Sequence, residues 1–187
     1  IHGVIHAAGI KLFKTIEEIS ISECQQQLRA NGHGLFVLEK ILQGIELDFC
    51  VLVSSLSSVL GALGMAAYPA AHAFTDAFIY KHNQTNSTPW MAVNWDNWLT
   101  KQLTIELATK PEISTEFFMT SQEGIEVFQR ILSLNNLNQI VVSTTDLQAR
   151  IEQLIKPSEV VHQSNSTALH SRPDLLNNYV APTNETE

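Results

Sequence analysis

Two side chains in the stretch SSLSSVLGALGMAAYPAAHAF, residues 54–74, could do chemistry together: Ser55 and Tyr68 lie 13 residues apart (68 − 55 = 13). A tyrosine can protonate a carbonyl oxygen as it becomes an alcohol, and a serine hydroxyl can hydrogen-bond the same oxygen. An ordinary phenol, with a pKa of about 10, normally needs a nearby cation to donate its proton efficiently at neutral pH. His72 follows Tyr68 by one helical turn. The pair suits carbonyl reduction. The same spacing is also compatible with a buried strand followed by a core helix that has no catalytic role.

The elements around this pair are predicted to place both side chains in one cleft. FCVLVSS, residues 49–55, is a near-continuous apolar run that ends in hydroxyls, which is typical of a parallel strand buried on both faces. A helix predicted over residues 65–83 begins close to Tyr68. Because sites in parallel α/β sheets lie at the carboxyl ends of strands, Ser55 and Tyr68 are expected to face the same edge. The small residues of GALGMAA, residues 61–67, allow a ligand to approach closely.

The whole chain alternates between short apolar runs and longer segments of helical period, which predicts an α/β fold with a doubly wound parallel sheet. Strands are expected at residues 4–8, 49–55, 90–96 and 139–144, and helices at residues 20–43, 65–83 and 121–133. Ser20 or Ser22 should cap the first helix, which Gly32 and Gly34 weaken. Residues 97–118 are expected to form an irregular connection.

No G-x-G-x-x-G loop stands between a strand and a helix, where its amides would hold a pyrophosphate. GALG, residues 61–64, is too short and follows the wrong element. We therefore expect the phosphate-binding half of a nucleotide-binding fold to lie upstream of residue 1.

Composition narrows the function classes. Among 187 residues, 11 are Lys or Arg and 19 are Asp or Glu, which gives a net charge of −8. This charge does not favour binding to nucleic acid or to an anionic membrane. No apolar run reaches the roughly 18 residues that cross a bilayer. The two cysteines, Cys24 and Cys50, suit a reducing cytoplasm, and Cys50 is expected to be a small buried hydrophobe. No metal site is expected.

Residues 156–187 differ in character, being rich in Ser, Asn, Thr and Pro without a sustained period. This composition predicts an extended linker after a domain that covers residues 1–155.

Several segments in this order resemble the carboxyl-terminal half of a ketoreductase domain from a modular polyketide synthase, of the kind in hybrid polyketide/peptide assembly lines: GVIHAAG, FCVLVSSLSSVLGALGMAAYPAAHAFTDAF, AVNWDNW, MTSQEGIEVFQRIL and VVSTTDLQARI. That family belongs to the short-chain dehydrogenase/reductases, which have a Rossmann-like fold. The resemblance implies reduction of a β-ketoacyl thioester to a β-hydroxyacyl thioester with NADPH as cofactor. The substrate would be carried on the phosphopantetheine of an acyl carrier protein, and RPDLLNNYVAPTNETE resembles the linker before such a protein.

The resemblance also implies site residues. The family's serine falls on Ser55 and its tyrosine on Tyr68. HAAG corresponds to the turn beneath the cofactor, which makes Ala7, Ala8 and Gly9 cofactor-binding candidates, while His6 is given no proton-transfer role. Further candidates on the cofactor side are Val93 and Asn94, in a strand end that leads into the family's lid. Trp95 and Trp98 are equally compatible with core packing.

The resemblance breaks at two positions. The family keeps a lysine 24 residues before the serine, where this chain has Asn31 (55 − 24 = 31), and an asparagine four residues after the tyrosine, where it has His72. In ordinary short-chain dehydrogenases these two residue types are exchanged, with asparagine at the first position and lysine at the second. This chain has no lysine at either position. One hypothesis is that Asn31 and His72 form a modified relay with Ser55 and Tyr68. The other is a non-reducing structural domain that holds the carrier protein, and a free-standing dehydrogenase is disfavoured.

Overall fold

The computed structural model describes residues 1–86, 88–108, 115, 117–134 and 137–154. The chain divides into two units, Ile1–Lys156 and Pro157–Glu187. The linker predicted over residues 156–187 lies outside the described residues, so it stays a prediction.

Four parallel strands form the central sheet, which confirms the predicted fold class. They are β1 (Gly3–His6), β2 (Phe49–Ser55), β3 (Trp90–Trp95) and β6 (Gln139–Val141), in the spatial order β1-β2-β3-β6. The central pairing runs from Cys50 opposite Trp90 to Ser55 opposite Trp95. All carboxyl ends therefore meet at one edge of the sheet.

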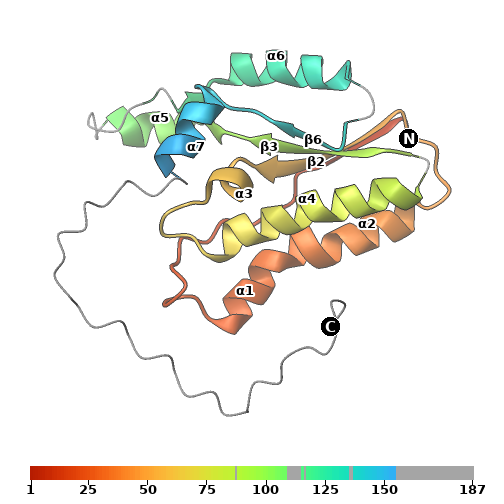
Figure 1. Ribbon diagram of the computed structural model, residues 1–187, viewed down its shortest axis with the longest axis horizontal. Coiled ribbons are helices and arrows are strands. Elements are labelled where there is room, and N and C mark those ends of the chain that lie inside the picture. Colours follow the sequence, from red (N-terminus) through yellow and green to blue (C-terminus); the bar gives the residue numbers. More distant parts are fainter. Residues whose placement is uncertain (87, 109–114, 116, 135–136, 155–187) are drawn as a thin grey trace, which may run out of the picture. The chain divides into compact units, whose positions relative to one another are not determined.

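Helices cover both faces of this sheet (Figure 1). On one face lie α1 (Ile21–Leu28), α2 (Gly34–Leu42) and α4 (Ala67–Thr85), and on the other lies α6 (Ser121–Leu132). Ser20 caps α1 and forms a capping box with Glu23, as the sequence suggested.

The long helix predicted over residues 20–43 is interrupted by a π-helical turn, η1 (Arg29–His33), between α1 and α2. The interruption falls at the glycines that were expected to weaken the helix, because glycine has a low helix propensity. Asn31 is buried within this turn. The widened turn is thus part of what places Asn31 in the interior.

Two hydrophobic clusters fill the two sides of the sheet. Alternate residues of β2 point to opposite faces, so Cys50 and Leu52 join one cluster and Val51 joins the other. Cys50 is 1% exposed, which confirms it as a buried small residue, and burial raises the pKa of its thiol to about 12. Burial on both faces explains the continuous apolar run of β2.

Three helices were not expected from the sequence. The short helix α3 (Ser57–Leu60) follows β2, α5 (Lys101–Ala108) follows β3, and α7 (Leu147–Leu154) follows β6. The prediction of a wholly irregular connection over residues 97–118 was wrong, because KQLTIELA consists mainly of good helix formers and Thr100 Oγ1 accepts a hydrogen bond from Leu103 N. The flanking strands β4 (Asn97–Trp98) and β5 (Phe118–Met119) pair in parallel.

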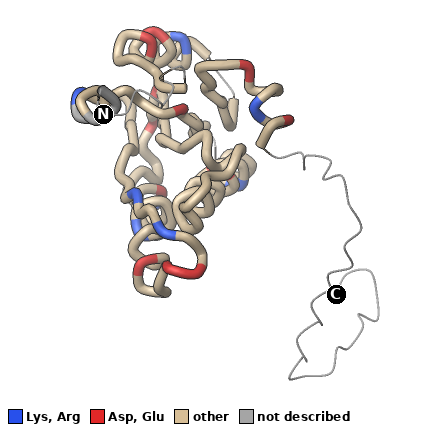
Figure 2. Tube along the Cα trace, turned by 90° about the vertical axis from the view of Figure 1, so that its left-hand side faces the viewer, with Lys and Arg blue, Asp and Glu red and all other residues tan. Residues whose placement is uncertain are grey.

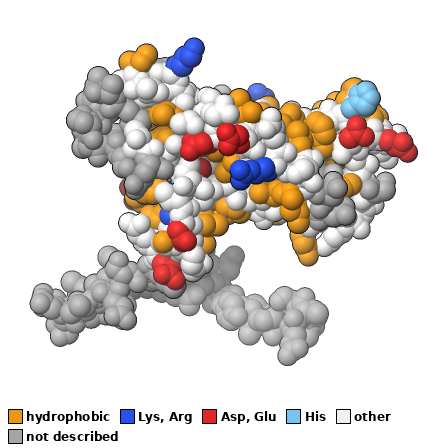
Figure 3. Space-filling view, turned by 90° about the horizontal axis from the view of Figure 1, so that it is seen from above, with side chains coloured by type: hydrophobic (Ala, Val, Ile, Leu, Met, Phe, Trp, Pro, Cys, Tyr) orange, Lys and Arg blue, Asp and Glu red, His pale blue; other side chains and the backbone are white. Residues whose placement is uncertain are grey.

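The described surface carries no segregated charge. Figure 2 shows basic and acidic positions interspersed along the trace, and Figure 3 shows hydrophobic side chains lying between charged ones on the α6 side. Of the helices in the described ranges, none is long and apolar enough to cross a membrane.

Candidate active site

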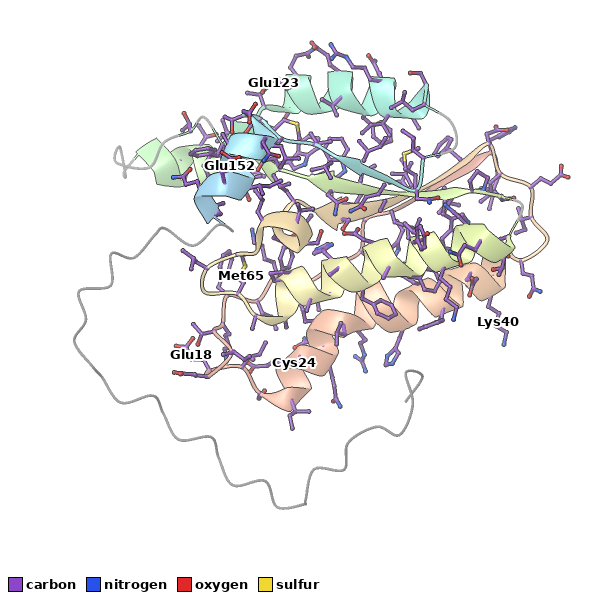
Figure 4. All side chains as sticks on the ribbon, viewed as in Figure 1. Glu18, Cys24, Lys40, Met65, Glu123 and Glu152 are labelled. Carbon is purple, nitrogen blue, oxygen red and sulfur yellow. The ribbon has the colours of Figure 1, made fainter. Side chains whose placement is uncertain are left out.

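A cavity of about 210 Å³ lies at the carboxyl edge of the sheet. It is bounded by the loop after β1, the end of β2 with α3, the start of α4, the end of β3, and α7. Met65, one of its lining residues, precedes α4 at the same end of the sheet as α7, whereas Lys40 lies near the far end of α2 (Figure 4). Ser55 and Tyr68 both line this cavity. The structure thus brings together the two residues that the sequence singled out first.

Ser55 is the last residue of β2 and faces the cavity, while its neighbour Ser54 points to the opposite side. Ser54 is buried, and its Oγ donates to the carbonyl oxygen of His72 at 3.5 Å. The Ser55 Oγ accepts from the Ser57 amide at 3.2 Å and lies 2.9 Å from the Ser57 Oγ. Strand alternation therefore selects Ser55. It also leaves Ser57, which was not predicted as a site residue, as a second hydroxyl at the same place.

Tyr68 and His72 lie one turn apart on α4, so their side chains share a face of the helix. Their rings meet edge to face, with centroids 4.5 Å apart. Tyr68 is half-buried, whereas His72 is only 5% exposed. The imidazole therefore supports the phenol from the interior of the protein.

Asn31 reaches the same imidazole from η1. Its Nδ2 lies 3.4 Å from His72 Nδ1 and donates to Thr75 Oγ1 at 3.2 Å. Because an amide nitrogen only donates, this arrangement suits a neutral imidazole whose Nδ1 accepts. Burial lowers the pKa of His72 from 6.5 to about 4; the Asp76 carboxylate opposes this shift and the Lys11 ammonium adds to it. His72 is neutral at pH 7 and carries no positive charge there.

The cofactor-side candidates from HAAG follow β1 at the carboxyl edge. Ala7, Ala8 and Gly9 are exposed. A Cβ added at Gly9 would lie 3.9 Å from Asn31 Oδ1, a buried oxygen with no hydrogen-bond partner among the described residues. An open edge of small residues beside an unpaired buried acceptor fits a flat, hydrogen-bonding ring such as nicotinamide with its carboxamide.

The other cofactor-side candidates, Val93 and Asn94, are 0% exposed. Asn94 Nδ2 donates to Ser58 Oγ and Asp76 Oδ2, each at 2.7 Å, so the side chain ties β3 to α3 and α4. A direct cofactor contact from these two residues stays a prediction.

Of the two tryptophans, Trp95 is buried in the core and Trp98 is 38% exposed. Part of the predicted lid after β3, residues 109–114 and 116, lies outside the described residues.

One ion pair closes the cavity on the α7 side. Arg150 Nη1 lies 2.5 Å from Asp96 Oδ2, and the same oxygen accepts from the amide and the hydroxyl of Thr144, each at 3.0 Å. Asp96 follows β3, and its side chain is 2% exposed. The pair is thus a structural link between β3 and α7.

Lys11, which was not predicted as a site residue, has its ammonium beside Tyr68. Nζ is 5.4 Å from the centroid of the Tyr68 ring. Its position two residues after the HAAG turn is the signal that could have found it, because that loop leaves the carboxyl end of β1. Among the residues that the structure describes, no cluster of His, Cys, Asp and Glu could hold a metal ion.

Sequence comparison relates this chain to a known family. The sequence model of the KR domain family matches residues 1–100. The polyketide synthase PksL of Bacillus subtilis (strain 168) is 31% identical over 163 residues, which cover 84% of this chain and 4% of the relative. The chain thus spans a small part of that protein.

Solved structures share the fold. A ketoreductase domain from the bacillaene assembly line superposes with a TM-score of 0.65 at 26% identity, covering 82% of this chain and 39% of the other. An alcohol dehydrogenase from the archaeon Thermococcus sibiricus, solved in complex with 5-hydroxy-NADP, has a TM-score of 0.61 at 16% identity, covering 78% of this chain and 63% of the other. The chain therefore belongs to the KR family, the ketoreductase domains of polyketide synthases, within the short-chain dehydrogenase/reductase superfamily.

Proposed function

We propose that the complete domain containing this chain reduces a β-ketoacyl thioester to a β-hydroxyacyl thioester during polyketide biosynthesis. The observation that carries the proposal is that Ser55 and Tyr68, from two different elements, line one cavity at the carboxyl edge of a parallel sheet. Family membership supports an oxidoreductase role for such a site.

The residues at the end of β1 fit the nicotinamide end of a dinucleotide cofactor, for which we propose NADPH. Ala7, Ala8 and Gly9 would lie against the ring and ribose, with Asn31 Oδ1 available as an acceptor. When bound, the cofactor supplies the hydride. The superposed alcohol dehydrogenase, solved with 5-hydroxy-NADP, supports a nicotinamide cofactor.

The chain's own residues would handle the proton and the carbonyl oxygen. Ser55 Oγ hydrogen-bonds the ketone oxygen, and Tyr68 donates its phenolic proton to that oxygen as the carbonyl carbon gains the hydride. The products are the alcohol and a phenolate at Tyr68. The neutral His72 holds the Tyr68 ring in place, since the centroids of the two rings are 4.5 Å apart. Asn31 in turn holds His72, with its Nδ2 3.4 Å from His72 Nδ1.

The substrate would be presented on the phosphopantetheine of an acyl carrier protein, as family membership suggests, and the proposed location is the cytoplasm. The cavity of about 210 Å³ has room for the reacting ketone and its neighbouring atoms, while the remainder of the thioester would extend outward.

A second candidate is a domain with impaired activity that has a structural or carrier-docking role. The observation in its favour is that neither Asn31 nor the neutral His72 supplies the positive charge that the family's lysine provides.

One experiment distinguishes the two candidate functions. The complete domain is given a β-ketoacyl thioester of N-acetylcysteamine as substrate, and turnover is followed as NADPH oxidation. We expect turnover in the natural sequence and its loss in Tyr68→Phe, with the β-hydroxy product identified by mass spectrometry. A folded domain that binds NADPH but leaves the thioester unreduced would instead support the structural role.

A further inference from the structure

The loop after β1 brings a lysine into the cavity that Ser55 and Tyr68 line. The Lys11 Nζ lies 5.4 Å from the Tyr68 ring centroid and 5.0 Å from the Phe13 ring centroid. Lys11 is itself a lining residue of this cavity. Its side chain is exposed as a whole, yet burial is sufficient to lower the pKa of its ammonium.

Hydrogen bonds hold this loop on both sides of Lys11. The side chain of Gln27, fully buried on α1, donates to the Ile10 carbonyl and accepts from the Leu12 amide at 3.2 Å. Further along, the Lys14 carbonyl accepts from the Ala66 amide at 3.1 Å, next to the start of α4. The backbone of Lys11 is therefore fixed relative to both α1 and α4.

The positive charge of Lys11 is not neutralised by the other charged residues that line the cavity. Three charged residues line it, and two of them, Asp96 and Arg150, form an ion pair with each other. The ion pairs found in the described ranges join Lys14 to Glu23, His82 to Glu39, and Arg150 to Asp96, so none includes Lys11. The net charge at the cavity wall is that of Lys11.

We propose that Lys11 supplies the positive charge that Tyr68 needs as a proton donor, in place of the family lysine whose position is occupied by Asn31. This inference rests on the proposed reductase function. Lys11 acts through Tyr68 and is a positioning residue: its ammonium, held over the phenol ring, stabilises the negative charge that develops on Tyr68 as its proton leaves. His72 cannot take this part at pH 7, because it is buried and neutral.

The test compares Lys11→Met, which removes the charge, with Lys11→Arg, which keeps it, in the complete domain. We expect Lys11→Met to lower kcat about tenfold with a smaller change in KM, and Lys11→Arg to stay within about threefold of the natural domain. Lys14→Met is the matched control, because it removes the same charge from the same loop but from a side chain paired with Glu23 at 2.6 Å. It should leave kcat unchanged.

Two readouts separate a charge effect from a structural one. Ethylamine should partly restore turnover in Lys11→Ala, since it returns an ammonium to the vacated space. The alkaline limb of the pH-rate profile should move to higher pH in Lys11→Met, because the phenolate loses its stabilising cation. The other ionisable groups near Tyr68 are His72, which contacts its ring, Asp76, which acts on His72, and the cavity-lining Asp96 and Arg150. All four stay unchanged in these variants.

A further measurement does not depend on turnover. The Lys11 ammonium lowers the pKa of His72, so the imidazole titration followed by NMR should move upward in Lys11→Met and remain in place in Lys11→Arg. A natural domain without turnover overturns the proposed function. Turnover that Lys11→Met leaves intact, or a His72 titration that it leaves in place, overturns the role of Lys11 alone.

Discussion

The side-chain amide of Asn31 lies 3.4 Å from Nδ1 of His72, although the two residues are 41 positions apart in the chain. These are the two positions at which the sequence is predicted to depart from the ketoreductase pattern. Their contact is buried and uncharged at neutral pH, so the two departures form one unit behind Tyr68. That unit can position the phenol, while any cation must come from elsewhere.

Burial of His72 predicts a loss of stability in mild acid. The pKa of His72 is lowered from 6.5 to about 4, so the folded state binds fewer protons than the unfolded state between these values. The contribution of the neutral imidazole is complete above pH 6.5 and is lost as pH falls toward 4, by up to about 3 kcal/mol. Urea unfolding at a series of pH values should show this decline in the natural domain and a shallower one in His72→Gln. Equal declines in both would contradict the buried neutral imidazole.

Removal of the phenolic hydroxyl predicts a large kinetic effect. Tyr68→Phe should lower kcat at least about a hundredfold with β-ketoacyl thioester as substrate, because the proposed proton donor is gone while the ring contact with His72 remains. Stopped-flow measurement of NADPH oxidation checks this. Retention of most of the activity would assign proton donation to another group.

The hydroxyl pair at the end of β2 predicts partial compensation. Ser57 Oγ lies 2.9 Å from Ser55 Oγ, so Ser55→Ala should cost less than the double change Ser55→Ala with Ser57→Ala. We expect roughly tenfold for the single variant and a hundredfold for the pair, each measured as kcat. A double variant no worse than Ser55→Ala would leave Ser57 without a part in the reaction.

Restoration of the family pattern distinguishes the two candidate functions. If Lys11 already supplies the charge, Asn31→Lys with His72→Asn should raise kcat by no more than about tenfold over an active natural domain. An inactive natural domain that gains turnover in the double variant would instead favour the structural role. Circular dichroism and NADPH binding of each variant control for folding.

The Asp96–Arg150 link predicts strong coupling in stability. Arg150→Met should destabilise the domain by about 3 kcal/mol, because it leaves a buried carboxylate without its charged partner. Adding Asp96→Asn should return part of that loss in a double-mutant cycle. Lys14→Met, which breaks the half-exposed pair with Glu23, should cost less than about 1 kcal/mol. Additive effects at Asp96 and Arg150 would argue against the link.

The sequence by itself determined the four strands of the central sheet, the main helices and the placement of Ser55 and Tyr68 at one cavity. Apolar runs predicted β2 and β3 because strands buried on both faces need apolar side chains at successive positions. Spacing and the hydroxyls at the end of β2 predicted that Ser55 and Tyr68 would meet, since parallel strands end at one edge. These features depend on the local pattern of apolar and polar residues, which can be read directly from the sequence.

Tertiary structure alone decided the electrostatics of the site. Asn31, His72 and Lys11 come from three segments, and their contacts depend on the π-helical turn and on a loop anchored by Gln27. Burial makes His72 neutral, and the folding of the loop over α4 brings Lys11 to Tyr68. A pKa and a charge environment arise from groups packed in three dimensions, so residue types and spacing left open which side chain carries the charge.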